Sequence, residues 1–190
     1  MKNSKLILSS MLIAASMFCN QSFAQTMDKN VKVGGESMYP TKDIIENAVN
    51  SNVHTTLVAA VKAAGLVETL KGKGPFTVFA PTNDAFENLP AGTVETLLKP
   101  ESKASLTKVL TYHVLSGSYN FEELKNQIKK SGGKATFPTV SGGTLMFTMN
   151  GEKNISVWDE NGNGANISVY DVKQSNGVIH VIDAVVLPKM

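Results

Sequence analysis

The sequence predicts an α+β fold in which helices come first along the chain and strands come last. Apolar residues recur at helical spacing from Asp43 to about residue 130, and the period becomes two after Lys134. One early segment departs from this order, because residues 76–80 are apolar on both alternating faces, as in a strand buried inside a sheet. This early strand has to pair with the late ones, so we expect helices packed on an antiparallel or mixed sheet.

The helical part consists of short amphipathic segments that glycine and proline separate. Gly65 and Pro100 stand where two of the helices are predicted to end. Lys129 and Lys130 are cations that suit the negative end of the last helix dipole. Helices are therefore expected over residues 43–49, 55–65, 82–89, 93–98, 102–113 and 121–130, with a short turn at 66–70 after the second.

The strands of the second part are joined by turns rich in asparagine and glycine. Asn150 and Gly151 form a dipeptide typical of a tight hairpin turn. Residues 159–164 also imitate the first half of a calcium-binding EF-hand loop, but Tyr170 stands where that loop needs a bidentate glutamate. We therefore predict a second hairpin turn there and no metal site. Strands are expected over residues 136–140, 144–149, 155–158, 165–170 and 178–187.

A strand, a sharp corner and a helix are specified together within residues 74–86, which read GPFTVFAPTNDAF. Pro81 removes a donor from the strand ladder and ends it. The hydroxyl of Thr82 is then placed to accept a hydrogen bond from a free amide of the next turn, as an N-cap does. The segment offers neither a nucleophile with a base nor a set of metal ligands, so we interpret it as a folding device.

Three segments of the chain together resemble the signatures of a known family, the fasciclin domain family. They are residues 74–86, the Tyr-His-Val-Leu segment at 112–115, and SNGVIHVIDAVVLP at 175–188. The resemblance covers about residues 39–189 and implies a fasciclin-like wedge, a β-sandwich with helices packed along one side, with the domain at 43–189. It also implies adhesion and extracellular contacts without catalysis, and it names no partner.

The resemblance also points to four candidate site residues, Tyr112, His113, Ile182 and Asp183. In animal matrix relatives, integrin attachment is attributed to a Tyr-His pair flanked by branched apolar residues and to an Asp and an Ile near the last signature. These positions also fit the apolar pattern of a core, and a residue that packs inside cannot bind outside. We expect the ring of His113 to face the core and to fix residues 114–115 by a hydrogen bond.

The first 24 residues predict export. Lys2 and Lys5 precede an apolar run that is too short to span a bilayer, and small residues stand at the two positions that a signal peptidase reads. Cleavage is expected before Gln25, which makes the protein secreted, either extracellular or periplasmic. Cys19 raises the alternative of a lipoprotein signal, but Phe18 stands where that signal needs a small residue. Residues 25–42 are predicted to form a flexible N-terminal lead.

Composition excludes several classes of function. All 18 basic residues are lysines, and loss of Lys2 and Lys5 leaves 16 of them against 16 acidic residues. A neutral chain without arginine is a poor ligand for nucleic acid. The single cysteine leaves with the signal, which removes disulfides and thiolate catalysis. His54 is interpreted as a helix-start residue, and His180 and Asp183 face opposite sides of a strand. We expect no enzymatic activity, no cofactor and no membrane span.

Two function classes remain. One is a non-catalytic adhesion or matrix-interaction module of a cell surface or biofilm, with a protein or glycan partner or weak self-association. The composition suggests a bacterial source, where integrins are not met. The alternative is a periplasmic binding protein for a lipid or another apolar small molecule, with a pocket expected around Tyr112, Phe147 and Trp158.

Overall fold

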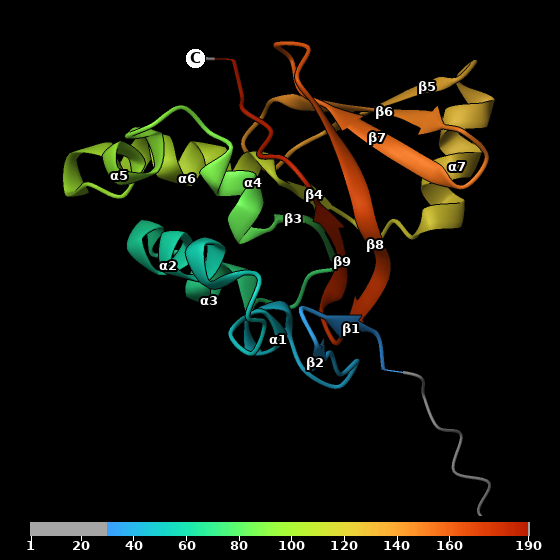
Figure 1. Cartoon of the computed structure of the whole chain (residues 1–190). Helices are drawn as coiled ribbons and strands as arrows, with labels where there is room; N and C mark the ends of the chain where they lie inside the picture. Colours follow the sequence, from blue (N-terminus) through green and yellow to red (C-terminus); the bar gives the residue numbers. More distant parts are fainter. Residues whose placement is uncertain (1–29, 190) are drawn as a thin grey trace, which may run out of the picture.

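A seven-stranded sheet with the strand order β4-β3-β9-β8-β7-β6-β5 forms the centre of the structure, a computed structural model that describes residues 30–189 (Figure 1). Its strands are β3 (Phe76–Pro81), β4 (Val114–Ser116), β5 (Lys134–Pro138), β6 (Thr144–Asn150), β7 (Asn154–Trp158), β8 (Gly164–Gln174) and β9 (Gly177–Ile182). A separate hairpin consists of β1 (Lys32–Val33) and β2 (Glu36–Ser37). The helices are α1 (Ile44–Ala48), α2 (Thr55–Ala64), α3 (Val67–Leu70), α4 (Asn83–Glu87), α5 (Thr93–Leu97), α6 (Lys103–Tyr112) and α7 (Phe121–Lys130), with a 3₁₀ turn η1 at Pro100–Ser102. The predicted α+β class, with helices first and strands last, is confirmed.

The early strand β3 lies inside the sheet, as its two apolar faces predict. It pairs in parallel with β9 along its whole length and antiparallel with β4. The next strand, β8, bends at two register shifts between Ile167 and Val172. Its first residues pair with β7 and the rest pair with β9, so the sheet turns at β8 into two halves. Bulges of this kind increase the local twist of a strand and re-aim its side chains.

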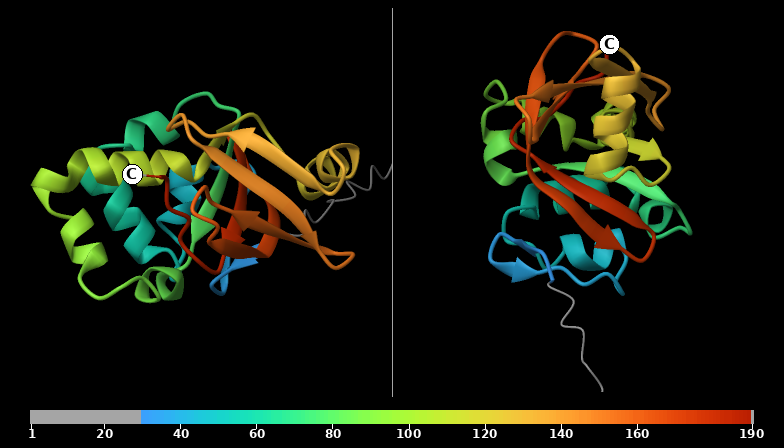
Figure 2. Two further views of the ribbon diagram at one scale, coloured as in Figure 1. Left: turned by 90° about the horizontal axis from the view of Figure 1, so that it is seen from above. Right: turned by 90° about the vertical axis from the view of Figure 1, so that its right-hand side faces the viewer.

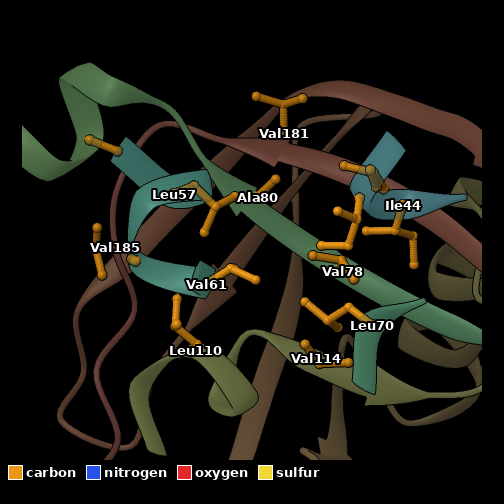
Figure 3. Packing of buried hydrophobic residues seen from close by; sticks show 14 of the residues in the cluster. Ile44, Leu57, Val61, Leu70, Val78, Ala80, Leu110, Val114, Val181 and Val185 are labelled. Atoms are coloured by element: carbon orange, nitrogen blue, oxygen red, sulfur yellow. The ribbon is translucent and has the colours of Figure 1, made fainter. Parts of the chain in front are cut away.

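The helices cover the sheet in two groups, and each group buries its own hydrophobic cluster. Helices α1 to α6 lie together beside β3 and β9, whereas α7 lies apart from them beside β5 and β6 (Figures 1 and 2). The helix-side cluster includes Ile44, Leu57, Val61, Leu70, Val78, Leu110, Val114 and Val181, which converge on β3 from several elements (Figure 3). The α7-side cluster includes Phe79, Tyr112, Leu124, Ile128, Phe137, Leu145, Phe147 and Ile182.

Alternation along β3 explains why both clusters depend on this strand. Val78 and Ala80 face the helix-side cluster, and Phe79 between them faces the α7-side cluster. The corner that follows has the predicted cap, because Thr82 Oγ1 accepts a hydrogen bond from the Ala85 amide at 3.3 Å. Asn83 then ties this corner to α2, because its Oδ1 accepts from the Thr56 amide at 3.0 Å.

The structure differs from the predicted flexible lead over the part of residues 25–42 that it describes. Residues 32–37 form the β1-β2 hairpin, and Val33 and Met38 are buried in the helix-side cluster. The hairpin is also tied to α1, because Tyr39 exchanges two hydrogen bonds with the Asn47 side chain, at 3.0 and 2.8 Å. Two apolar side chains in a polar segment show no period, so the sequence pattern did not reveal them.

The predicted signal, its cleavage site before Gln25 and Cys19 lie outside the described residues. Among residues 30–189, none of the helices has the length and apolar character needed to cross a membrane.

Candidate functional site around Tyr112 and His113

The Tyr-His pair stands at the C-terminal end of α6, between the two clusters. Leu106, Val109 and Leu110 bury one stripe of this helix. Tyr112 ends the helix and points into the α7-side cluster. His113 is the C-cap residue and borders a cavity within the helix-side cluster. The pair therefore joins the two halves of the core.

Tyr112 is completely buried, and its hydroxyl holds two loops of the sheet. The ring is 0% exposed. The hydroxyl donates to the Thr144 carbonyl at 2.6 Å and accepts from the Glu160 amide at 3.1 Å. Burial, together with the nearby carboxylates of Glu160 and Asp159, raises the pKa of Tyr112 to about 12. The hydroxyl thus remains a donor at physiological pH, and neither the ring nor the hydroxyl is presented to a partner.

His113 is a neutral internal hydrogen-bonding group. Its side chain is 3% exposed, and Nδ1 lies 2.8 Å from the Val109 carbonyl oxygen. A carbonyl only accepts, so Nδ1 carries the proton, and Nε2 accepts the bond that the Val186 amide donates at 3.2 Å. Burial lowers the pKa of His113 to about 4, against the opposing effects of the Val109 carbonyl and Asp159. Both ring nitrogens of the neutral His113 are therefore hydrogen-bonded within the domain.

The partners of His113 differ from the prediction. We expected the ring to fix residues 114–115, and it instead joins the last turn of α6 to Val186, 73 positions further along the chain. The expectation that the ring faces the core is met. The sequence did not reveal Val186 as the partner, because nothing local indicates which distant amide lacks an acceptor.

Ile182 and Asp183 lie next to one another but in different surroundings. Ile182 is 0% exposed in the α7-side cluster. Asp183 is exposed, and its carboxylate accepts from the Asn166 amide at 2.7 Å and from Asn166 Nδ2 at 3.1 Å. Of the four candidate residues, Asp183 is the one at the surface.

The turn at residues 159–164, which resembles an EF-hand loop, is hydrogen-bonded to the segment that follows β9. Asp159 is buried, and its carboxylate accepts from the amides of Asn161, Asn163 and Leu187 at 2.9, 2.8 and 3.0 Å. The turn joins β7 to β8, as predicted. By bonding the Leu187 amide, the Asp159 carboxylate holds the segment after β9 in place. The neighbouring residue in this segment, Val186, is the hydrogen-bond partner of His113. Within the described part of the chain, no three acidic, histidine or cysteine side chains gather as a metal site would need.

A cavity of about 80 Å³ lies within the helix-side cluster, between α1, α2, α3 and β3. Its walls are almost entirely aliphatic, with Leu57 and Val61 from α2 and Val78 from β3 among them. The sequence placed a pocket around Tyr112, Phe147 and Trp158 instead. Tyr112 and Phe147 are fully buried in the other cluster, and neither they nor Trp158 line this cavity.

Ser51 and His54 bring a polar pair to this cavity, which the sequence reasoning missed. Ser51 Oγ lies 2.8 Å from His54 Nδ1, and both residues are buried. Among residues 30–189, His54 Nε2 has no partner within hydrogen-bond distance and angle, although the Ala80 carbonyl is near enough to the ring to affect its pKa. Burial lowers the pKa of His54, with the Ala80 carbonyl opposing it. The i, i+3 spacing of the two residues was visible, but their contact depends on the turn that starts α2.

Comparison with known proteins identifies this architecture. Residues 52–188 match the model of the Fasciclin domain family. The chain belongs to the fasciclin domain family. Protein sll1483 of Synechocystis sp. is 46% identical over 166 residues, which cover 87% of this chain and 84% of that protein. The cell surface glycolipoprotein MPB83 of Mycobacterium bovis is 33% identical over 175 residues, which cover 90% of this chain and 70% of that protein.

The fold of this fasciclin domain also matches a solved one. A FAS1 domain pair from the insect cell adhesion molecule Fasciclin I is similar with a TM-score of 0.69 and 19% sequence identity, over 77% of this chain and 51% of that chain. The likeness confirms the fold that the three sequence signatures predicted.

Proposed function

We propose that this fasciclin domain is a secreted, non-catalytic adhesion or matrix-interaction module that mediates cell-surface or biofilm contacts. The observation that carries the proposal is the family membership, with relatives named as a cell surface glycolipoprotein and a cell adhesion molecule. The partner is a protein or glycan of a cell surface or matrix, with weak self-association as a further contact.

The burial of Tyr112 and His113 supports an attachment site elsewhere on the domain. Both side chains are buried and have their polar atoms bonded within the chain. A residue in this position stabilises the domain, and a partner touches only what the domain exposes. Asp183 is exposed, so it is the candidate residue that a partner reaches directly.

The Ser51–His54 pair does not resemble a hydrolase site. Both residues are buried, and the serine contacts Nδ1 of the imidazole. Within residues 30–189, no carboxylate is bonded to the remaining nitrogen, Nε2, whereas an activated serine needs a base that a third group holds in place. The pair therefore supports a packing role for these two residues.

Attachment by a deletion strain tests the proposed function. We expect loss of surface attachment or biofilm when the gene is deleted, and recovery when the full chain is supplied. A form without residues 1–24 is the matched control and should not restore attachment, because it is not exported. Normal attachment by the deletion strain would reject the adhesion role.

Export makes a separate prediction about the N-terminus. The exported protein should begin at Gln25 and carry no lipid, because Phe18 precedes Cys19 in place of a small residue. Intact-mass analysis of the exported protein measures this directly. A chain that begins with a diacylglyceryl-modified Cys19 would show that the lipoprotein alternative is correct.

The cavity supports the second candidate function, a periplasmic small-molecule binding protein. Its volume of about 80 Å³ is roughly half that of an engineered apolar cavity that admits benzene. A ligand of a few heavy atoms fits this space, and a lipid would require the helices to move apart. The free Nε2 of His54 would give such a ligand one hydrogen bond.

Xenon tests the carrier alternative without knowledge of the ligand. Xenon should shift the methyl NMR signals of Leu57 and Val61, which line the cavity, and leave those of Leu145 in the α7-side cluster unchanged. Protein purified from its source should also release a small molecule on denaturation. Unshifted methyl signals would remove the cavity as a binding site.

A further inference from the structure

The sheet half that α7 covers on one side has a second face whose side chains are mostly exposed or half-buried, with Ser156 as a buried member. Side chains alternate along β5 to β8, so Leu145, Phe147 and Val157 point into the α7-side cluster while their neighbours point outward. We call the outward set the outer sheet face. It consists of Lys134, Thr136, Thr144, Met146, Thr148, Asn150, Asn154, Ser156, Trp158, Gly164, Asn166 and Ser168.

Trp158 lies across the middle of the outer sheet face. It pairs with Met146 on β6 and with Gly164 on β8. A Cβ atom at Gly164 would lie 2.8 Å from Cζ3 of the indole, so the six-membered ring lies directly over the glycine backbone. On the opposite side, Nε1 donates to Thr148 Oγ1 at 2.9 Å. The indole therefore spans from β8 to β6 with its polar atom bonded.

The indole of Trp158 lies outside both hydrophobic clusters of the core. Trp158 is half-buried, and it belongs to neither the helix-side nor the α7-side cluster. A large aromatic ring held flat on an exposed sheet keeps an apolar face available to a partner. Because contacts on two neighbouring strands already hold the ring, binding to it costs little side-chain entropy.

Hydrogen-bonding groups continue from Trp158 toward Asp183. Asn166 stands at their centre, because its Oδ1 accepts from Asn150 Nδ2 at 3.1 Å and from Ser156 Oγ at 2.9 Å. Its Nδ2 donates to Asp183 Oδ2 at 3.1 Å. These groups bond mainly to one another. Within residues 30–189, the second Nδ2 hydrogen of Asn166 and the side-chain oxygen of Asn150 remain as a donor and an acceptor for a ligand.

The charge of the outer sheet face restricts its partner. Lys134 on the edge strand β5 is the charged member of the set, and two carboxylates border it. Glu160 accepts from the Thr144 amide at 2.9 Å, and Asp183 is bonded to Asn166. The centre around Trp158 is uncharged, which suits a neutral partner and gives no attraction to a polyanion or an anionic membrane. A neutral polyhydroxylated ligand is complementary to an aromatic ring surrounded by amides and hydroxyls.

We propose that the outer sheet face binds a neutral glycan, with a sugar ring stacked on Trp158 and its hydroxyls bonded to Asn166 and neighbouring polar groups. A pyranose ring has an apolar face of C–H bonds that packs on an indole and a rim of hydroxyls that needs both donors and acceptors. This inference rests on the proposed adhesion function, because it names the partner class and the surface.

The only tryptophan of the chain is Trp158, so its fluorescence reports on this surface alone. The probes are soluble neutral hexasaccharides of glucose, mannose and N-acetylglucosamine, titrated separately into the exported protein. At least one series should shift or quench the emission in a saturable way. Unchanged emission with all of them, together with no heat of binding, would overturn the proposal.

Two substitutions locate the binding. Trp158→Ala, measured by calorimetry, should weaken binding about tenfold or more, because it removes the stacking surface. Gly164→Ala keeps the fluorophore but places a methyl group 2.8 Å from the ring, so the indole must shift and affinity should fall while the fold remains. Tyr39→Ala removes an exposed aromatic ring beside the β1-β2 hairpin and should bind as the unmodified protein does. Equal affinity of Trp158→Ala and Tyr39→Ala would contradict the proposal.

The attachment assay separates this inference from the proposed function. If the deletion strain complemented with Trp158→Ala attaches normally, adhesion stands and the glycan surface is wrong. If the deletion itself has no effect, the adhesion role fails, and the titration still decides whether the surface binds sugars. Loss of attachment after protease treatment of the target, with no loss after glycosidase treatment, would indicate a protein partner and overturn the glycan proposal.

Discussion

The two halves of the core are packed in different ways. The α7-side cluster is built from aromatic rings in mutual contact, with centroid distances of 5.1 Å for Phe79–Phe147, 5.4 Å for Phe137–Phe147 and 4.8 Å for Tyr119–Phe137. The helix-side cluster is built mainly from branched aliphatic side chains on short helices, and it encloses the cavity and the unbonded His54 Nε2. The free energy of unfolding is therefore expected to depend most on the α7-side cluster. The helix-side cluster is expected to change its packing more easily.

The largest expected effect comes from Phe79, the β3 residue at the centre of the α7-side cluster. Phe79→Ala should lower the free energy of unfolding by about 3–5 kcal/mol, because its ring is completely buried against Phe147 and His180. Urea titration measures the loss, with Val61→Ala beside the cavity as the comparison. An equal or larger loss for Val61→Ala would contradict the difference between the two halves.

Acid should weaken the domain through its buried imidazoles. The pKa of His113 is lowered to about 4 by burial, and burial also lowers the pKa values of His54 and His180. The unfolded chain binds more protons than the folded one below the usual pKa of about 6.5, so stability is complete above that pH and falls toward pH 4. His113 alone should account for about 2 kcal/mol at pH 5.

Urea midpoints at pH 7.5 and pH 5 measure this acid effect. Because burial of His113 alone contributes about 2 kcal/mol to the loss at pH 5, the difference between the two midpoints should be smaller in His113→Gln. A midpoint independent of pH would show that the imidazoles are not held neutral by the fold.

His113→Ala tests whether the residue between the two halves acts through the fold. The substitution leaves the Val109 carbonyl and the Val186 amide without their partner, and this should cost about 1–3 kcal/mol. Attachment should fall only in proportion to the folded fraction. Thermal melts and binding assays at matched folded concentration check this. Unchanged melting with lost attachment would make His113 a contact residue.

The smallest effect is expected at the corner between β3 and α4. Thr82→Ala should cost about 1 kcal/mol, because it removes one N-cap hydrogen bond to the Ala85 amide without opening the core. Thr82→Ser keeps the hydroxyl and is the matched control. Urea titration should rank both variants well above Phe79→Ala in stability, and a Thr82→Ala loss as large as that of Phe79→Ala would contradict this ranking.

Sequence reasoning succeeded where neighbours along the chain carry the information. Thr82 stands at the end of an apolar strand and before a helical stripe, so its capping role was visible from residues 76–89. It failed for β4, because no strand was predicted over Val114 to Ser116, which pair with β3 in the sheet. Three residues are too short to show a period, and their pairing strand lies far away in the chain.

At the candidate site, too, sequence reasoning predicted some features and missed others. The signatures pointed to Tyr112, His113, Ile182 and Asp183, and the apolar pattern around them indicated a core. That pattern did not separate Asp183, which is exposed, from the buried Ile182 beside it. Nor did it reveal Trp158 as a surface residue, because its place over Gly164 results from the register between β7 and β8.

By itself, the sequence determined the fold class, the strand and corner around residues 76–86 and the hairpin turns, and the export signal stays a prediction. These depend on local propensity, capping and periodicity, which act between residues a few positions apart. Only the tertiary structure decided the burial of Val33 and Met38, the Val186 partner of His113, the cavity beside His54 and the half-buried indole of Trp158. Each of these depends on which distant segments meet, and burial of apolar surface across the whole chain sets those contacts.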